Sequence, residues 1–228
     1  MIRDLDRLQS IIGYTFTDKG ILKQALIHPS YSGEMHMQRF ESNQRLEFLG
    51  DAVLELVTSE YLYTEHPQTE EGELTKKRSS LVFEAALNEC AKNIGLGNYI
   101  YLGRGEDAGG GREKPSILSD TFEAVIGAIY LDGGFEEAKR FIHSFVIDKI
   151  DEMSLLRDGK SLIQKYVQKD PEAVLEYKLE EVAEPGHPER FKAQLFINGR
   201  YISEGRGQSK KHAEQNAAVA ACRKLNVK

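Results

Sequence analysis

Two pairs of carboxylates, each set in an apolar stretch with helical periodicity, are the residues best suited to chemistry in this sequence. Glu47 and Asp51 stand four residues apart and Asp120 and Glu123 three apart, so each pair lies on one face of a helix. Acids near a buried face are costly unless a positive charge offsets them. Because no cysteine or histidine stands beside them, they favour Mg²⁺ or Mn²⁺ over zinc. A divalent ion held there would activate water and stabilise charge on a phosphoryl group.

A plainer interpretation of these acids is that they are solvated. Acid pairs at helical spacing arise by chance, and either pair alone is a weak signal. Glu55 extends the first row by one further turn and is a competing ligand candidate. We interpret Glu55 as a solvated or interface acid, because the second pair offers no third acid to match it.

The elements that must position these acids are helices. Residues 43–62 form one apolar stripe through Leu46, Leu49, Val53, Leu56 and Val57, which predicts a long helix carrying the first pair. The second pair falls in a predicted helix over residues 116–131. Further helices are expected near residues 5–12, 21–26, 75–94 and 135–150. The glycine-rich segment 96–114 is expected to be a surface loop.

The pattern changes after a short polar stretch at residues 154–158. A helix is expected over residues 159–168, then strands over 174–181, 190–196 and 200–206, and a last helix over 209–225. Asn198-Gly199 is a strong hairpin signal between the second and third strands. The order α-β-β-β-α predicts an antiparallel three-stranded sheet with two helices on one face.

The charge of the chain is unevenly distributed. The 228 residues carry a net charge of -6, with 16 basic and 26 acidic residues in positions 1–156 but 14 and 10 in positions 157–228. An acidic body with a basic tail suits a metal-using domain joined to a polyanion-binding module, although uneven surface charge alone also produces it. No apolar run is long enough for a membrane span, the N-terminus does not suit a signal peptide, and the two cysteines fit a reducing cytoplasm.

The motifs around these acids resemble the bacterial ribonuclease III family over nearly the whole chain. Residues 43–53 match the family signature Asn-Glu-Arg-Leu-Glu-Phe-Leu-Gly-Asp, and residues 117–124 match a second long motif. Shorter matches lie at residues 14–16, 25–30, 71–75 and 102–106. The resemblance implies an all-α endonuclease domain over residues 1–153, a linker at 154–158, and a small α+β double-stranded RNA-binding domain over 159–228.

The resemblance also implies roles for single residues. Glu47, Asp120 and Glu123 match the magnesium ligands, for which Mn²⁺ is an alternative, and Asp51 and Glu123 match the catalytic pair. Family members cleave both strands of double-stranded RNA to 5′-phosphate and 3′-hydroxyl ends with short 3′ overhangs. They act as homodimers through the helical domain, with Phe48, Leu49 and Val53 expected to serve partly at that interface. Ribosomal RNA precursors, with some messenger and transfer RNA precursors, are the implied substrates.

In the tail, the resemblance implies RNA contacts from two helices and a loop. The expected contacts are Gln164, with Lys160 and Lys165 beside it, then His187, and Ser209, Lys210 and Lys211 at the start of the last helix. Such domains recognise the shape of A-form RNA through phosphates and 2′-hydroxyls. The alternative is that Ser209 only caps its helix and the lysines are merely solvated.

One position departs from the signature. Gln44 stands where the family has glutamate, an acid near the catalytic cluster that is not a metal ligand. We expect activity to survive, because glutamine is similar in size and still forms hydrogen bonds. A non-cleaving RNA-binding protein is the alternative function; a phosphohydrolase for small substrates would leave the basic tail unexplained.

Overall fold

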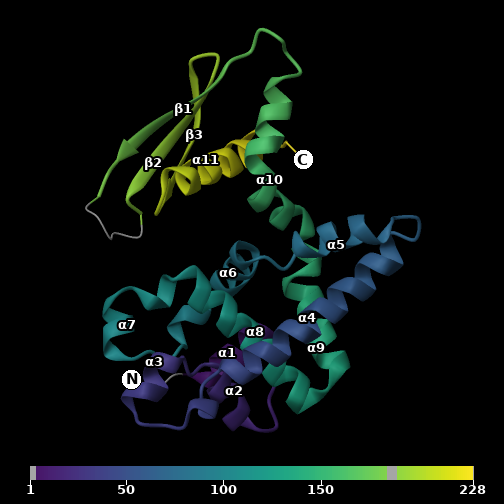
Figure 1. The fold of residues 1–228 in the computed structure, drawn as a ribbon, viewed down its shortest axis with the longest axis vertical. Helices are drawn as coiled ribbons and strands as arrows, with labels where there is room; N and C mark the ends of the chain where they lie inside the picture. The colour runs from purple at the N-terminus through teal and green to yellow at the C-terminus, as the bar shows by residue number, and fades with distance from the viewer. Residues whose placement is uncertain (1–3, 184–188, 228) are drawn as a thin grey trace. The chain divides into compact units, whose positions relative to one another are not determined.

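The computed structural model describes residues 4–183 and 189–227, which form two compact units, Met1–Ile150 and Asp151–Lys228 (Figure 1). The first unit is helical and the second contains the sheet. The helices of the first unit are α1 (Leu5–Ile12), α2 (Lys19–Ala25), α3 (Pro29–Glu34), α4 (Gln44–Glu65), α5 (Glu71–Ser79), α6 (Glu84–Asn93), α7 (Arg104–Ala108), α8 (Pro115–Gly133) and α9 (Phe135–Phe145). Short 3₁₀ turns lie at Arg39–Glu41, Leu96–Asn98, Gly111–Glu113 and Ile147–Lys149.

Helix α8 is the centre of the first unit. Its sequence is apolar almost throughout, and eleven of its residues are buried, including Phe122 and Ile126. Helices α2, α4, α6 and α9 all pack against it. A helix that is apolar on most of its faces is expected in such a central position. Because α4 and α8 are the most extensively packed helix pair of this unit, the two predicted acid pairs lie on neighbouring elements.

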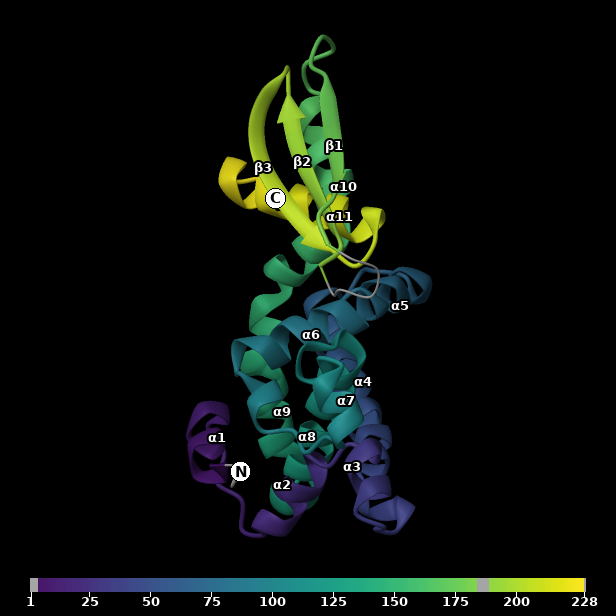
Figure 2. The ribbon, with the colours of Figure 1, turned by 90° about the vertical axis from the view of Figure 1, so that its left-hand side faces the viewer.

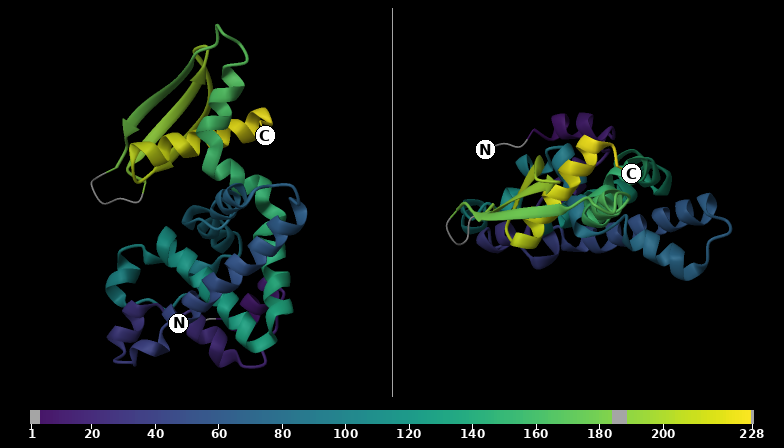
Figure 3. Two further views of the ribbon diagram at one scale, coloured as in Figure 1. Left: turned by 45° about the vertical axis from the view of Figure 1, so that its right-hand side comes forward. Right: turned by 90° about the horizontal axis from the view of Figure 1, so that it is seen from above.

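The expected single helix over residues 75–94 is two helices. Helix α5 ends at Ser79, and α6 begins at Glu84 after Phe83, whose backbone is extended. Between them, Leu81 is buried, and its backbone N–H donates to the carbonyl oxygen of Arg78. Burial of Leu81 therefore turns the chain without a glycine or proline, so no local signal marked the break. Helix α5 folds back beside the C-terminal half of α4, seen in blue in Figure 3.

The second unit has the predicted α-β-β-β-α order. Its elements are α10 (Ile150–Val167), β1 (Leu175–Glu181), β2 (Phe191–Ile197), β3 (Arg200–Gly207) and α11 (Lys210–Leu225). The sheet is antiparallel with strand order β1-β2-β3, and α10 and α11 lie together on one face (Figure 2). The core between sheet and helices contains Ile163, Ala193, Leu195, Ala213, Ala217, Ala218, Ala221 and Cys222.

Two details of this unit bear on the sequence predictions. Asn198 and Gly199 both have positive φ, 52° and 72°, as a two-residue hairpin turn of type I′ requires, so the hairpin prediction is confirmed. Helix α10 runs continuously through residues 154–158, where we expected a polar linker. This stretch contains no proline and only one charge pair, so nothing in it opposes a helix.

Candidate active site on helices α4 and α8 and candidate RNA contacts of the second unit

The crossing of α4 and α8 depends on two glycines. Gly50 of α4 faces the backbone of Glu123, and Gly127 of α8 faces the backbone of Leu46. A Cβ built on Gly127 would lie 2.2 Å from the carbonyl oxygen of Leu46, far closer than atoms can approach. Only glycine at both positions allows this backbone contact. The two acid-bearing turns are therefore held directly against one another.

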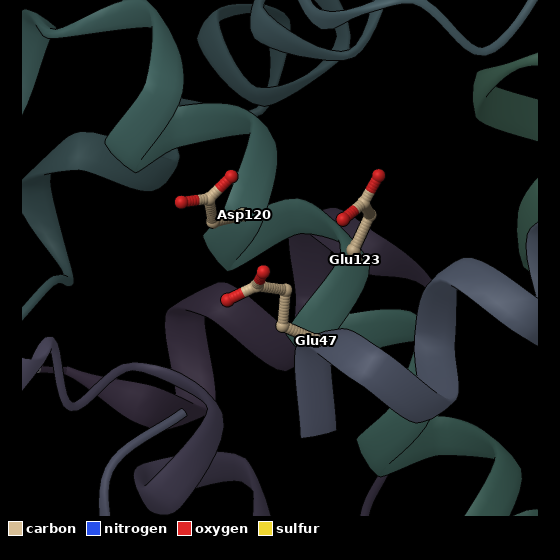
Figure 4. Close-up of side chains that lie close together, drawn as sticks. All are labelled: Glu47, Asp120 and Glu123. Atoms are coloured by element: carbon tan, nitrogen blue, oxygen red, sulfur yellow. The ribbon is translucent and has the colours of Figure 1, made fainter. Parts of the chain in front are cut away.

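Three of the predicted acids converge at this crossing. Oxygen atoms of Glu47, Asp120 and Glu123 lie within 4.8 Å of one another, and their carboxylates share one space between the helices (Figure 4). All three side chains are half-buried. Asp51 lies one turn after Glu47 and is exposed, but its charge reaches the cluster, because it raises the pKa of Glu47 and of Glu123. The structure thus gathers all four predicted acids in one region.

The cluster is short of positive charge. Burial, followed by the charges of Asp51, Asp120 and Glu47, raises the pKa of Glu123 to about 8. Burial and neighbouring acids also raise the pKa of Glu47 and that of Asp120, although a hydrogen bond from Ser119 partly opposes the shift of Asp120. Among the described residues, no lysine or arginine forms an ion pair with these acids. Converging carboxylate oxygens that lack a cationic partner fit a hard divalent cation.

Two further acids, Glu55 and Glu84, lie outside the three-carboxylate group. Glu55, the competing ligand candidate, lies outside the three-carboxylate group and forms an ion pair with Arg78 at 3.9 Å. Glu84, at the start of α6, was missed by the sequence analysis, yet its charge contributes to the raised pKa of Asp120. Because residues 75–94 were expected to be one helix, no signal pointed to Glu84.

Gln44, the departure from the signature, is the first residue of α4. It is exposed and stands three residues before Glu47, on the same side of the helix. Its position near the cluster is consistent with an effect on activity without direct participation.

The predicted RNA contacts of the second unit lie on α10 and α11. Gln164 and Lys165 are exposed on α10, and Lys210 and Lys211 are exposed in the first turn of α11. Ser209 is the N-cap of α11, with its Oγ accepting a hydrogen bond from the backbone N–H of His212 at 3.2 Å. Lys160 differs, because its ammonium group forms an ion pair with Glu214. His187 lies outside the described residues.

Comparison with known proteins places both units in characterised families. The family described as Ribonuclease-III-like matches residues 18–150, and the double-stranded RNA binding motif matches residues 160–225. A protein of Listeria welshimeri named Ribonuclease 3 is 42% identical over 222 residues, covering 96% of this chain and 97% of the relative. A Bacillus licheniformis protein of the same name is 43% identical over 221 residues, covering 96% and 89%.

Solved structures agree for the helical unit. The nuclease domain of ribonuclease III from Campylobacter jejuni has a TM-score of 0.57 at 43% identity, covering 63% of this chain and 96% of that chain. A second structure of that domain, with TM-score 0.57 and 43% identity over 62% of this chain and 98% of its own, is described as flexible in a region involved in dimer formation. Within the described residues, no helix combines the length and apolar character needed to cross a bilayer.

Proposed function

The chain belongs to the ribonuclease III family of double-strand-specific endoribonucleases, and we propose that it cleaves double-stranded RNA in a magnesium-dependent reaction. The observation that carries the proposal is the convergence of Glu47, Asp120 and Glu123 within 4.8 Å on two crossing helices, in a chain that also contains an RNA-binding fold. Three acids able to hold a divalent cation and a double-strand-binding module in one chain are together well suited to hydrolysis of duplex RNA.

In this proposal, Glu47, Asp120 and Glu123 hold Mg²⁺, with Mn²⁺ as an alternative. Both ions prefer carboxylate oxygens, and the raised pKa of Glu123 to about 8 indicates that a cation is needed to stabilise its charged form. A bound ion would lower the pKa of an attacking water and would offset the negative charge on the phosphoryl oxygens.

Asp51 and Glu123 form the catalytic pair in this proposal. Asp51 is exposed beside the cluster, so its carboxylate is free to accept the proton of a water that approaches the scissile phosphorus. The water oxygen forms a bond to phosphorus while the bond from phosphorus to the 3′-oxygen breaks, and the leaving 3′-oxygen takes up a proton from solvent water to become the 3′-hydroxyl. The products are a 5′-phosphate and a 3′-hydroxyl, with short 3′ overhangs where the two strands are cut at staggered positions.

The second unit supplies duplex recognition. We place Gln164 in the minor groove and the turn of Ser209, Lys210 and Lys211 on phosphates across the major groove. The amide groups and dipole at the start of α11 add to the charge of the two lysines. His187 is proposed as a loop contact on the family resemblance alone. We keep residues 1–153 as the catalytic domain, 154–158 as the connection and 159–228 as the RNA-binding domain.

A homodimer formed through the helical domain completes the proposal. Phe48, Leu56 and Tyr63 lie along one side of α4, with 79%, 56% and 76% of their surfaces exposed. Exposure of three large apolar side chains on one side of a helix is unfavourable in water and marks an interaction surface. A pocket of about 360 Å³ lies at Leu56 and Tyr63, lined by α4 and by Leu74, Thr75 and Arg78 of α5. Of the residues we expected at this interface, Phe48 remains a candidate, whereas Val53 is buried in the core at 6% exposed.

The proposed substrates and location follow the family resemblance. Precursors of ribosomal RNA are the main expected substrates, with some messenger and transfer RNA precursors, in the cytoplasm. Cys90 and Cys222 are both buried as thiols, which suits a reducing compartment.

The test uses the full chain and a long RNA duplex, with and without Mg²⁺. We expect short duplexes with 5′-phosphates when Mg²⁺ is present, and a gel shift of intact RNA when it is absent. Glu123→Gln should abolish cleavage and keep the shift, whereas Glu136→Gln, an exposed acid on α9, should cleave normally. A wild-type protein that only shifts RNA in Mg²⁺ would identify a binding protein and refute the proposal.

A further inference from the structure

Lys160 of α10 contacts groups from two other elements of the second unit. Its Nζ lies 2.6 Å from Oε2 of Glu214 on α11, and the two side chains are 40% and 23% exposed. The same Nζ lies 5.3 Å from the centroid of the Tyr177 ring on β1, within the range of a cation–π contact. A carboxylate and an aromatic ring therefore share this ammonium group, in contrast to the exposed Lys165 on the same helix.

The residue before Lys160 provides a second contact between the two helices. A Cβ built on Gly159 would lie 2.9 Å from Cγ2 of Val219, and Sγ of Cys222 lies 3.5 Å from the carbonyl oxygen of Gly159. Glu214 and Cys222 stand eight residues apart on α11, or about 12 Å along its axis. Gly159 and Lys160, which are adjacent on α10, thus contact two separated points of α11. These two contacts oppose sliding and rotation of one helix against the other.

On each helix, the ion pair lies one turn from a candidate RNA contact. Gln164 follows Lys160 by four residues on α10, and Lys210 precedes Glu214 by four residues on α11, so each lies one turn from its end of the pair. Together with the core around Ile163, the Lys160–Glu214 pair therefore links the helix of the minor-groove contact to the helix of the phosphate contact. An A-form duplex presents these two features at a fixed separation.

We propose that Lys160 is a positioning residue for RNA recognition, which acts by pairing with Glu214 and not by touching a phosphate. The proposal rests on the RNA-binding role given above to the second unit. It differs from the expectation in the sequence analysis, which placed Lys160 among the residues that contact RNA.

The two roles predict different responses to salt. Each lysine that contacts a phosphate contributes about 0.9 to the slope of log Kd against log salt concentration. Loss of a positioning residue weakens binding at every salt concentration and leaves that slope unchanged. Lys211→Met is the matched comparison, since it removes a proposed phosphate contact and should lower the slope by about 1.

The experiment measures binding of the full chain, in EDTA to prevent cleavage, to a labelled RNA duplex of about 30 base pairs, longer than the ~16 that one such domain covers. Fluorescence anisotropy at about 50 to 250 mM KCl gives the salt slope. We expect Lys160→Met to weaken binding about five-fold with the slope unchanged. Gln164→Ala should weaken RNA binding about ten-fold in the wild-type background. In the Lys160→Met background it should weaken binding less than about two-fold, because the two changes disrupt one arrangement.

Glu214→Gln separates the roles even if Lys160→Met folds poorly. It removes a negative charge, so a phosphate-contacting Lys160 would be freed and RNA binding would strengthen; a positioning role predicts weaker binding. Stronger binding by Glu214→Gln, or a slope lowered by about 1 in Lys160→Met, would overturn the proposal. A wild-type protein that fails to bind the duplex at all would instead overturn the proposed function on which it rests.

Discussion

Gly50 of α4 touches the backbone of Glu123 on α8 so closely that a Cβ on Gly50 would lie 1.8 Å from the carbonyl oxygen of Glu123. This contact joins a residue of the first acid-bearing helix to an acid of the second. It explains why a glycine stands between Glu47 and Asp51 in an otherwise regular helix, where glycine normally costs about 1 kcal/mol relative to alanine.

Gly50→Ala is therefore predicted to push the two helices apart. Overpacking of this kind costs about 1–3 kcal/mol of unfolding free energy, and displacement of the carboxylates should lower cleavage at least about 100-fold. Chemical denaturation and the initial rate of duplex cleavage measure the two effects. Gly72→Ala on α5 is the matched control, because a Cβ there meets nothing within 4 Å, and it should be neutral or slightly stabilising. Equal behaviour of the two variants would contradict the role of the crossing.

The raised pKa of Glu123 makes the stability of the metal-free protein depend on pH. Its pKa is about 8 when folded against 4.5 ordinarily, so between these values the folded protein holds a proton that the unfolded chain has released. Stability must then fall as pH rises through this window, by an amount on the order of 1–2 kcal/mol after allowance for solvent screening.

Thermal unfolding in EDTA from about pH 5 to about pH 8.5 checks this dependence. Glu123→Gln should flatten the profile, and saturating Mg²⁺ should restore stability to the wild type at high pH but not to the variant. A wild-type protein whose metal-free stability rises across the window would show that Glu123 is not held in its protonated form.

Gln44 offers a test of the departure from the family signature. Since Gln44 is exposed in the first turn of α4, whereas Glu123 is one of the three converging acids, Gln44→Glu should change the cleavage rate less than Glu123→Gln does. Steady-state rates over a range of Mg²⁺ concentrations measure both variants. An inactive wild type that gains cleavage through Gln44→Glu would mean that the missing acid is essential.

The exposed apolar side of α4 predicts the oligomeric state. Leu56→Asp should convert a dimer to a monomer and strongly reduce cleavage, because a buried unpaired carboxylate at an interface is costly. Leu131→Asp on α8 is closely matched, with 54% of the leucine exposed against 56% for Leu56, and should leave the dimer intact. Sedimentation at several protein concentrations distinguishes the two; a monomeric wild type would refute the dimer.

Much of this arrangement could be predicted from residue patterns, because local periodicity and turn chemistry marked it. The stripe through Leu46 and Val57 identified α4, and Asn198-Gly199 identified the hairpin between β2 and β3. The break between α5 and α6 could not be predicted, since burial of Leu81 is a tertiary effect.

The candidate site was predictable as two pairs of acids but not as one cluster. Spacing places Glu47 with Asp51 and Asp120 with Glu123, yet it contains no information on how α4 meets α8. Gly50 and Gly127 were the available signal, because small residues at corresponding turns of two apolar helices permit a close crossing. The Lys160–Glu214 pair had no such signal, as the partners lie 54 residues apart.

The binding of Mn²⁺ to the full chain, followed by electron paramagnetic resonance as the free ion is depleted, tests the proposed metal centre most directly. We expect a Mn²⁺ site in the wild type that is lost, or weakened at least about ten-fold, in each of Glu47→Gln, Asp120→Asn and Glu123→Gln, and retained in Glu55→Gln. Undiminished Mn²⁺ binding in all three cluster variants would contradict the claim that these carboxylates form the metal centre.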